Sequence, residues 1–395
     1  MIRAERRLAQ KAKAMTRLEI LKKAFEGKIT WQQAADICRL TPRHLRRLRE
    51  RYQLLGPDAL RDGRAERCMP HRITADMLDE LCRLKREVYP DFNIRHFHEF
   101  VSERHGLRLG YTTTRDILQL RGVVEKEACR GKYRRKRERR PMRGVLIHLD
   151  ASTHTWIAGL PMHDLNVVLD DADGQVLYAR FFPQEGVEST FAALKHVIER
   201  WGRFCELYTD RGSHFCTTSR AGEAPDEQQG TQLARVLRVL GIRHIRARTP
   251  EARGRSERCF ATFQGRLPQE LRVAGVRDYA AANEYLDKHF VADFNRRFTV
   301  VPTEPESAFV PLTGINLELL LSVQHERVVQ KDNTVHFERL CLQLPPGRER
   351  IHFARCPVLV HEFLDGTLGV SFQGKQLARF TRDAELVTKR KRRAA

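Results

Sequence analysis

The stretch LYTDRGSHF, residues Leu207–Phe215, runs from an apolar start into a carboxylate and then into a turn. We interpret ELYTD as a short buried strand that ends at Asp210. A second segment, VLIHLD, ends in the same way at Asp150. If the two strands are neighbours, their carboxylates meet at one edge of a sheet, and a divalent cation there offsets their repulsion. The pair therefore predicts a metal site at a sheet edge.

The elements around these strands predict an α/β domain with a mixed sheet. Two strands lie in LNVVLDDADGQVLYARFF, joined by a turn around Asp173 and Gly174. An amphipathic helix at 188–202, the strand before Asp210, and then a helix, a strand and a long helix follow. The order β-β-β-α-β-α-β-α suits a sheet with helices on its faces. Asp170, Asp171 and Asp173 are interpreted as turn residues.

The long helix, predicted for residues 255–271, supplies the third candidate carboxylate, Glu257. Its buried stripe is predicted to contain Phe260, Phe263 and Leu267. Three carboxylates suit two Mg²⁺ ions, with Mn²⁺ as a substitute, because hard oxygen ligands favour these cations. Glu251 is the alternative third ligand, in the loop before the helix.

Each candidate also has a plainer interpretation. Asp150 and Asp210 could cap strand ends, and Glu257 could be a surface acid on a helix. His214 is interpreted as a DNA contact or rim residue, because the sequence around it supplies no nitrogen or sulfur partners for a metal.

Composition points to a polyanionic partner. The 395 residues carry a net charge of +21, with 41% hydrophobic and 31% charged residues. The surplus of positive charge predicts nucleic-acid binding. The length predicts two to four domains. No apolar run reaches the length of a membrane helix, and the basic N-terminus lacks a signal peptide's apolar core. The scattered cysteines are expected to be reduced thiols, and the expected location is cytoplasmic and nucleoid-associated.

Residues 17–55 predict a helix-turn-helix. The third helix, PRHLRRLRERYQLL, follows the N-cap Thr41, and its exposed face is predicted to contact DNA through Arg43, His44, Arg46 and Arg47. The residues predicted to pack inward are Ala34, Ala35, Ile37, Leu45 and Leu48. The tight turn carries Arg39 where glycine is common. A solvated basic helix is the alternative interpretation.

The remaining segments complete a multidomain chain. Residues 130–140, RGKYRRKRERR, hold eight basic residues, and we expect Arg134, Arg135, Lys136 and Arg137 to lie on phosphates. A solvated linker is the alternative. The predicted domains are helix-turn-helix 1–60, a second helical domain 73–125, a basic linker 126–142, an α/β core 143–305, a small all-β barrel 331–384 and a basic tail 385–395.

The blocks HLDAS, LYTDRGSHF and ARGRSERCFATFQGRLPQELR together resemble the three catalytic blocks of DDE transposases of bacterial insertion sequences. The last block resembles the ISNCY and IS481-like groups, whose core is similar to that of retroviral integrases. Two features depart from the usual pattern. The spacing between Asp210 and Glu257 is 46 residues, longer than in integrases, and Arg211 and His214 replace the DNG-type sequence after the second aspartate.

The resemblance implies an RNase H-like core in which Asp150, Asp210 and Glu257 are catalytic and bind two Mg²⁺ ions. It implies an enzyme that cleaves element ends and joins their 3′ ends to target double-stranded DNA, working as a homo-oligomer. Two alternatives stay open. One is a non-catalytic DNA-binding regulator on a decayed scaffold, and the other is a structure-selective nuclease of the same fold.

Overall fold

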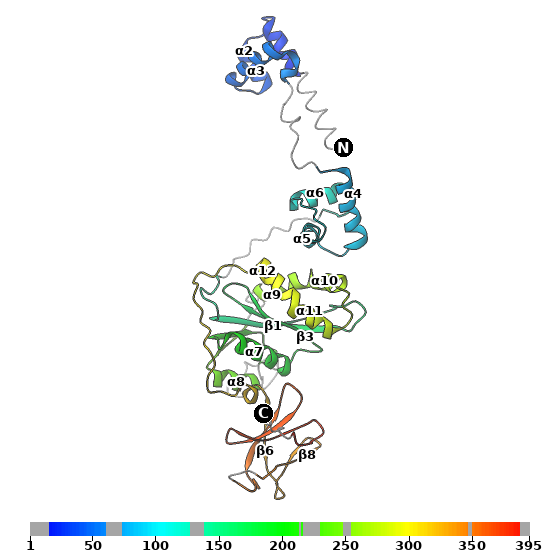
Figure 1. The fold of residues 1–395 in the computed structure, drawn as a ribbon. Coiled ribbons are helices and arrows are strands. Elements are labelled where there is room, and N and C mark those ends of the chain that lie inside the picture. Colours follow the sequence, from blue (N-terminus) through cyan, green and yellow to red (C-terminus); the bar gives the residue numbers. More distant parts are fainter. Residues whose placement is uncertain are drawn as a thin grey trace, which may run out of the picture. The chain divides into compact units, whose positions relative to one another are not determined.

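The computed structural model describes residues 16–60, 73–126, 138–212, 215, 230–247, 254–346 and 350–387. The chain divides into two compact units, Met1–Glu80 and Leu81–Ala395 (Figure 1). Within the described ranges, none of the helices combines the length and hydropathy needed to cross a membrane. The cysteines that lie in these ranges are free thiols, as predicted.

The first unit contains the predicted three helices. They are residues 16–25, α2 (Trp31–Cys38) and α3 (Pro42–Leu55), followed by the 3₁₀ turn η1 (Gly56–Leu60). The Thr41 hydroxyl accepts from the His44 amide, so the predicted N-cap is confirmed. The core includes Leu21, Ala34, Ala35, Leu45 and Leu48.

Two positions of this unit are instructive. Ile37 was predicted to be buried but is 58% exposed, because it lies about 110° around α2 from the midpoint of the buried pair Ala34 and Ala35. Arg39 ends α2 in the left-handed conformation, with φ 52°, and its amide donates to Ala35 and Asp36 carbonyls. The turn therefore forms with arginine at the glycine position.

A second helical segment begins just before the division at Glu80 and continues in the other unit. Its elements are α4 (Ala75–Arg83), the π-helical turn η2 (Leu84–Val88), α5 (Ile94–Arg104) and α6 (Tyr111–Leu120). The segment packs against the core through ion pairs, since Arg266 contacts Glu99 at 2.7 Å and Arg272 contacts Asp91 at 2.7 Å.

The central sheet has the strand order β3-β2-β1-β4-β5. Its strands are β1 (Leu146–His154), β2 (His163–Asp170), β3 (Val176–Phe182), β4 (Glu206–Thr209) and β5 (Arg243–Arg246). β1, β2 and β3 pair antiparallel, whereas β4 pairs parallel with both β1 and β5. The predicted order of elements and the mixed sheet are confirmed.

Helices cover both faces of this sheet (Figure 1). One face carries α7 (Val187–Trp201) and α8 (Gln232–Leu240), which pack on β1 residues such as Ile147 and Leu149. The other face packs through β2 residues such as Leu165 and Val167. The helices there are α9 (Gly254–Gln264), α10 (Leu267–Val273), α11 (Tyr279–Tyr285), the π-helical η4 (Leu286–Phe290) and α12 (Val291–Phe298).

The single long helix predicted for residues 255–271 is wrong in its length. The structure breaks it into α9 and α10 between Gln264 and Leu267. Pro268 lies in the first turn of α10, where its missing N–H costs nothing, and there it cannot continue a helix from α9. The predicted stripe of Phe260, Phe263 and Leu267 is nevertheless buried.

The C-terminal part consists of short antiparallel strands after α13 (Leu317–Leu320). Four of them form a sheet in the order β11-β10-β9-β6, and β7 pairs with β8. The strands are β6 (Val323–Val328), β7 (Thr334–Phe337), β8 (Leu340–Gln343), β9 (Pro357–Glu362), β10 (Leu368–Phe372) and β11 (Lys375–Phe380). The all-β character is confirmed, but the closed barrel is not, since the described strands form two separate sheets.

Two side chains of α8 tie this part to the core. Arg235 donates to the carbonyls of Leu320 and Ser322, at 3.1 and 2.7 Å. Gln232 exchanges hydrogen bonds with the main chain of Gln324. The junction therefore joins α8 side chains to main-chain groups at the start of the C-terminal sheet.

Candidate active site

Asp150 and Asp210 lie on neighbouring parallel strands. The register pairs His148 of β1 with Tyr208 of β4, so each aspartate follows the last paired residue by two positions. Asp150 is 7% exposed and Asp210 is half-buried. The two carboxylates therefore belong to corresponding positions just beyond the paired part of β1 and β4, as predicted. The prediction that the first strand ends at Asp150 is wrong, because β1 continues to His154 through its pairing with β2.

Main-chain groups orient both carboxylates. Asp150 Oδ1 accepts from the amide of Ala151 at 3.0 Å, and Asp210 Oδ1 accepts from the amide of Gly212 at 2.8 Å. The second bond closes a tight turn directly after β4. The direction of each side chain is therefore linked to the local backbone.

A hydroxyl and an imidazole hold the end of β4. Thr209 Oγ1 donates to the carbonyl of Asp210 at 2.9 Å and lies 2.8 Å from His244 Nε2. Because the hydroxyl proton is used toward Asp210, Nε2 is the donor of the second bond. Burial lowers the pKa of His244 to about 4, so its ring is neutral at pH 7. This pair ties β4 to β5 just before Asp210.

Glu257 lies in the first turns of α9, and it is exposed. Two residues further along, Cys259 is buried, and burial and then the charge of Asp150 raise the pKa of its thiol to about 12. At the other end of α9, Gln264 Nε2 donates to Ser152 Oγ at 2.9 Å. Helix α9 therefore packs along β1 beside Asp150.

The predicted carboxylates are not all brought together. Across the described part of the chain, no three His, Cys, Asp or Glu side chains form a group that could hold a metal ion. Glu251 and His214 lie outside the described residues. Asp150 and Asp210 lie at corresponding positions of β1 and β4, whereas Glu257 lies on α9 and stays a candidate third ligand.

Three acids that were predicted to be turn residues are also buried, which the sequence did not predict. Asp170, Asp171 and Asp173 do lie at the β2–β3 turn, but each is at most 3% exposed. Asp173 pairs with Arg143 at 3.1 Å, and Asp171 pairs with Arg255 at 2.9 Å. The run DDAD at the end of an apolar strand was the sequence signal for these ion pairs. Acids that are buried there need charged or hydrogen-bonding partners.

We expect Asp170 to make the stability of the core pH-dependent. Burial raises its pKa to about 6, although the amides of Gly144 and Ala172 donate to its carboxylate. Because the folded pKa lies above the unfolded one, its stabilising contribution is complete below about pH 4 and is lost as pH rises through about 6. Relative to the Asp170→Asn variant, the free energy of unfolding of the wild type should fall by about 3 kcal/mol between pH 4 and pH 7.

Denaturant unfolding of both proteins at several pH values checks this expectation. The Asn variant is the control, because it lacks the titrating group while all others stay in place. A stability difference that does not change with pH would contradict the prediction.

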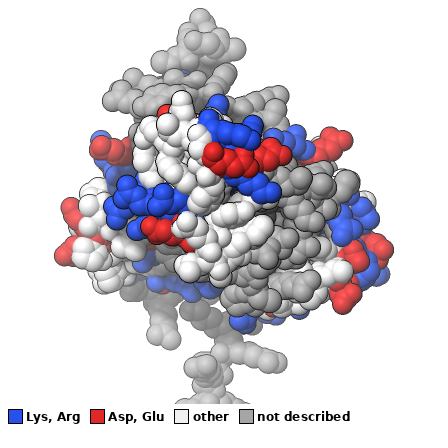
Figure 2. Space-filling model, turned by 90° about the horizontal axis from the view of Figure 1, so that it is seen from above, with Lys and Arg blue, Asp and Glu red and all other residues white. Residues whose placement is uncertain are grey.

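The predicted DNA-contact residues of α3 are all exposed, and they are Arg43, His44, Arg46 and Arg47. The linker residues Arg134, Arg135, Lys136 and Arg137 lie outside the described residues. Figure 2 shows Lys and Arg groups interspersed with Asp and Glu groups on the described part of the face that it views. On that part, the positive charge is spread among acids rather than gathered into one field.

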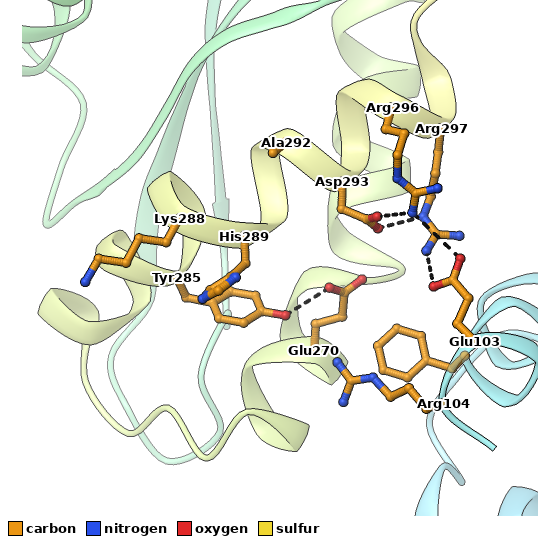
Figure 3. A pocket seen from close by; sticks show the side chains of 11 residues that line it. Glu103, Arg104, Glu270, Tyr285, Lys288, His289, Ala292, Asp293, Arg296 and Arg297 are labelled. Atoms are coloured by element: carbon orange, nitrogen blue, oxygen red, sulfur yellow. Dashed lines mark hydrogen bonds and ion pairs between the residues drawn. The ribbon is translucent and has the colours of Figure 1, made fainter.

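A cavity of about 590 Å³ lies among α5, α10, η4 and α12 (Figure 3). Its carboxylates already have partners. Glu103 and Asp293 each contact Arg297 at 2.6 Å, and Glu270 accepts from the Tyr285 hydroxyl at 3.2 Å. The cavity is separate from Asp150 and Asp210, and we assign it no function.

Comparison with known proteins agrees with the motifs. A winged helix-turn-helix family model matches residues 17–79. "Putative transposase y4bF" of Sinorhizobium fredii (strain NBRC 101917 / NGR234) is 29% identical over 374 residues, which cover 94% of this chain and 81% of that protein. The transposase for insertion sequence IS1202 of Streptococcus pneumoniae is 25% identical over 398 residues, which cover 90% of this chain and 83% of that protein. The predicted resemblance to insertion-sequence transposases is confirmed.

Solved structures with similarity to this chain include retroviral integrases. The HTLV-2 integrase catalytic core domain in complex with magnesium (dimeric form) is 16% identical, covers 38% of this chain and 90% of that one, and has a TM-score of 0.29. A simian T-cell lymphotropic virus intasome in complex with PP2A regulatory subunit B56 gamma is 15% identical, covers 78% and 100%, and has a TM-score of 0.33.

Proposed function

We propose that the chain is a transposase that cleaves insertion-sequence ends and joins the freed 3′ ends to target DNA. The observation that carries the proposal is the shared position of Asp150 and Asp210, each two residues beyond the last β1–β4 pair. Support comes from the transposases similar to most of the chain and from the winged helix-turn-helix match. The net charge of +21 suits a DNA substrate.

The carboxylates of Asp150 and Asp210 are the type of ligand that a hard divalent cation prefers. Asp150 and Asp210 offer carboxylate oxygens at one sheet edge, and we propose Glu257 as the third donor. These residues would hold two Mg²⁺ ions, with Mn²⁺ as a substitute. When bound, such ions supply positive charge for the attacking and leaving oxygens of phosphoryl transfer.

The chain's own residues supply orientation. The amides of Ala151 and Gly212 fix the directions of the two aspartates, and the Thr209–His244 pair holds the end of β4. A pre-oriented site lowers the barrier by removing the cost of arranging charged groups during the reaction. No residue of the chain is required to form a covalent bond to DNA.

DNA recognition is proposed for the first unit. Arg43, His44, Arg46 and Arg47 stand exposed on the α3 helix of a helix-turn-helix, where a recognition helix meets the major groove. We propose that Arg134, Arg135, Lys136 and Arg137 of the linker contact phosphates. Two element ends must be processed together, so we propose that at least two copies work on DNA. The domain bounds predicted from the sequence are retained as part of this proposal.

We expect loss of α3 arginines to weaken sequence preference more than overall binding. In the full-length chain, Arg43→Ala/Arg47→Ala should bind element ends at least about tenfold more weakly, because contacts to base edges discriminate between sequences. Lys22→Ala/Lys23→Ala removes the same number of exposed charges from residues 16–25 and is the control. Titrations of element-end and random duplexes measure the preference, and equal effects of both variants would contradict it.

A strand-transfer assay tests the function itself. Labelled element ends, unlabelled target duplex and Mg²⁺ should give cleaved ends and joined products. Cleavage without joining would support a nuclease instead, and binding without either reaction would support a regulator. Inverted repeats in the DNA on both sides of the reading frame would supply the substrate sequence.

A further inference from the structure

Asp171 is a buried junction between segments that are far apart in sequence. Its side chain is 0% exposed. His148 Nε2 of β1 lies 2.8 Å from Oδ1, Arg255 Nε of α9 lies 2.9 Å from the same atom, and the amide of Arg140 donates to Oδ2 at 2.8 Å. One carboxylate therefore links β1, the first turn of α9 and the C-terminal end of the basic linker.

The main chain strengthens this junction. The amide of Asp171 donates to the carbonyl of Leu146 at 3.0 Å, so the residue is fixed to the start of β1. Its own carbonyl accepts from Arg139 at 3.1 Å and from Arg255 Nη1 at 3.4 Å. Arg255 is thus held by both the side chain and the main chain of Asp171.

Helix α9 is attached to β1 at its other end as well. Gln264 Nε2 donates to Ser152 Oγ at 2.9 Å. The nine-residue step from Arg255 to Gln264 spans about 13.5 Å of helix, and the four-residue step from His148 to Ser152 spans about 13 Å of strand. Arg255 reaches β1 through Asp171, which contacts His148, so the two polar attachments have similar spacing along α9 and along β1.

Apolar packing alone does not fix that shift. Cys259, Phe260 and Phe263 bury one stripe of α9, but such contacts are non-directional and tolerate small sliding movements. The ion pair of Arg255 at one end and the neutral hydrogen bond of Gln264 at the other are polar contacts that depend on the separation of specific atoms. Glu257 lies between them, two residues after Arg255.

We propose that the Asp171–Arg255 ion pair, acting with the Ser152–Gln264 hydrogen bond, sets the position of α9 along β1 and thereby positions Glu257. Asp171 and Arg255 are positioning residues, since the part assigned to them is to hold the helix that carries Glu257. The role of Glu257 as a ligand rests on the proposed function, whereas the placement of α9 does not.

The test measures α9 directly and then the metal requirement. In the full-length protein, hydrogen exchange of the α9 amides should become about tenfold faster in Arg255→Gln and in Asp171→Asn. The Mg²⁺ concentration for half-maximal joining should rise about tenfold, as happens when groups that orient ligands are removed. Arg255→Lys keeps the charge but not the two-nitrogen contact, so it should restore both readouts in part.

A matched variant and an internal reference separate this role from a general loss of folding. Arg379→Gln removes an arginine of β11 that pairs with Glu318 of α13 and with Asp365 between β9 and β10, and α9 should keep its protection in that variant. Exchange of α7 should stay unchanged in every variant. A loss of activity through misfolding would instead speed exchange in α7 as well, and it would leave the half-maximal Mg²⁺ concentration of the folded fraction unchanged.

Unchanged α9 exchange in Arg255→Gln and Asp171→Asn would overturn the proposal. Faster exchange with an unchanged Mg²⁺ requirement would also overturn it, because α9 would then not position a ligand. A wild-type protein that joins no DNA would instead refute the proposed function, while the exchange data would still decide whether the pair holds α9.

Discussion

Replacing Asp150 or Asp210 by asparagine should reduce end cleavage and joining by at least about a hundredfold while binding to element ends survives. Asparagine keeps the size of the side chain and one oxygen acceptor, so the bonds from Ala151 and Gly212 can persist. It removes the negative charge that attracts a divalent cation. Cleavage, joining and binding are measured on the same labelled ends in Mg²⁺.

The control is Asp164→Asn on β2, which makes the same chemical change in the same sheet. Asp164 accepts from the hydroxyl of Thr153, three residues beyond Asp150 on β1, and from the amide of Glu185. We expect this variant to retain most joining activity. Near wild-type joining by Asp150→Asn or Asp210→Asn would show that the reaction takes place elsewhere on the chain.

Replacing Glu257 by glutamine should abolish strand transfer, whereas Glu251→Gln should reduce it modestly at most. Glu257 belongs to a helix that is buried on the sheet through Phe260 and Phe263 and attached at its ends by Arg255 and Gln264, so its place on the core is defined. Glu251 precedes α9 and is outside the described residues. A Mg²⁺-dependent joining assay compares the two variants.

The two substitutions act as controls for each other, since both remove one negative charge within seven positions of the sequence. Hydrogen exchange of α9 should stay unchanged in both. The reverse order of activities would move the third ligand to Glu251 and extend the active-site region into the segment before α9.

The features that the sequence predicted well are those set by local patterns. Apolar segments separated by turn and helix signals predicted the order of the core elements, and Thr41 with Pro42 predicted the start of α3. The burial of Ile37 was predicted wrongly. The inward face of α2 is the one that carries Ala34 and Ala35, and Ile37 lies off that face. Pro268 was a local signal for the break before α10. The prediction of one continuous helix followed the apolar stripe instead.

The buried acids of the β2–β3 turn depend on distant partners. The burial of Asp171 requires Arg140, His148 and Arg255, which come from three separate segments. No local pattern around residue 171 contains that information, so the turn could be predicted and the junction could not. The same reason leaves the linker contacts, the nucleoid association and the oligomer as predictions.

The junction at α8 bears on how the C-terminal sheet could be exchanged between related chains. Arg235 and Gln232 contact main-chain groups of residues 320–324, which any amino-acid sequence with the same backbone path provides. A chimera that keeps these two α8 side chains would therefore keep these hydrogen bonds, provided that apolar residues still fill the places of Leu320 and Leu321 in the core. A chimera that replaces Arg235 would leave carbonyls at the seam without their donor, even if every residue of the new sheet were well packed.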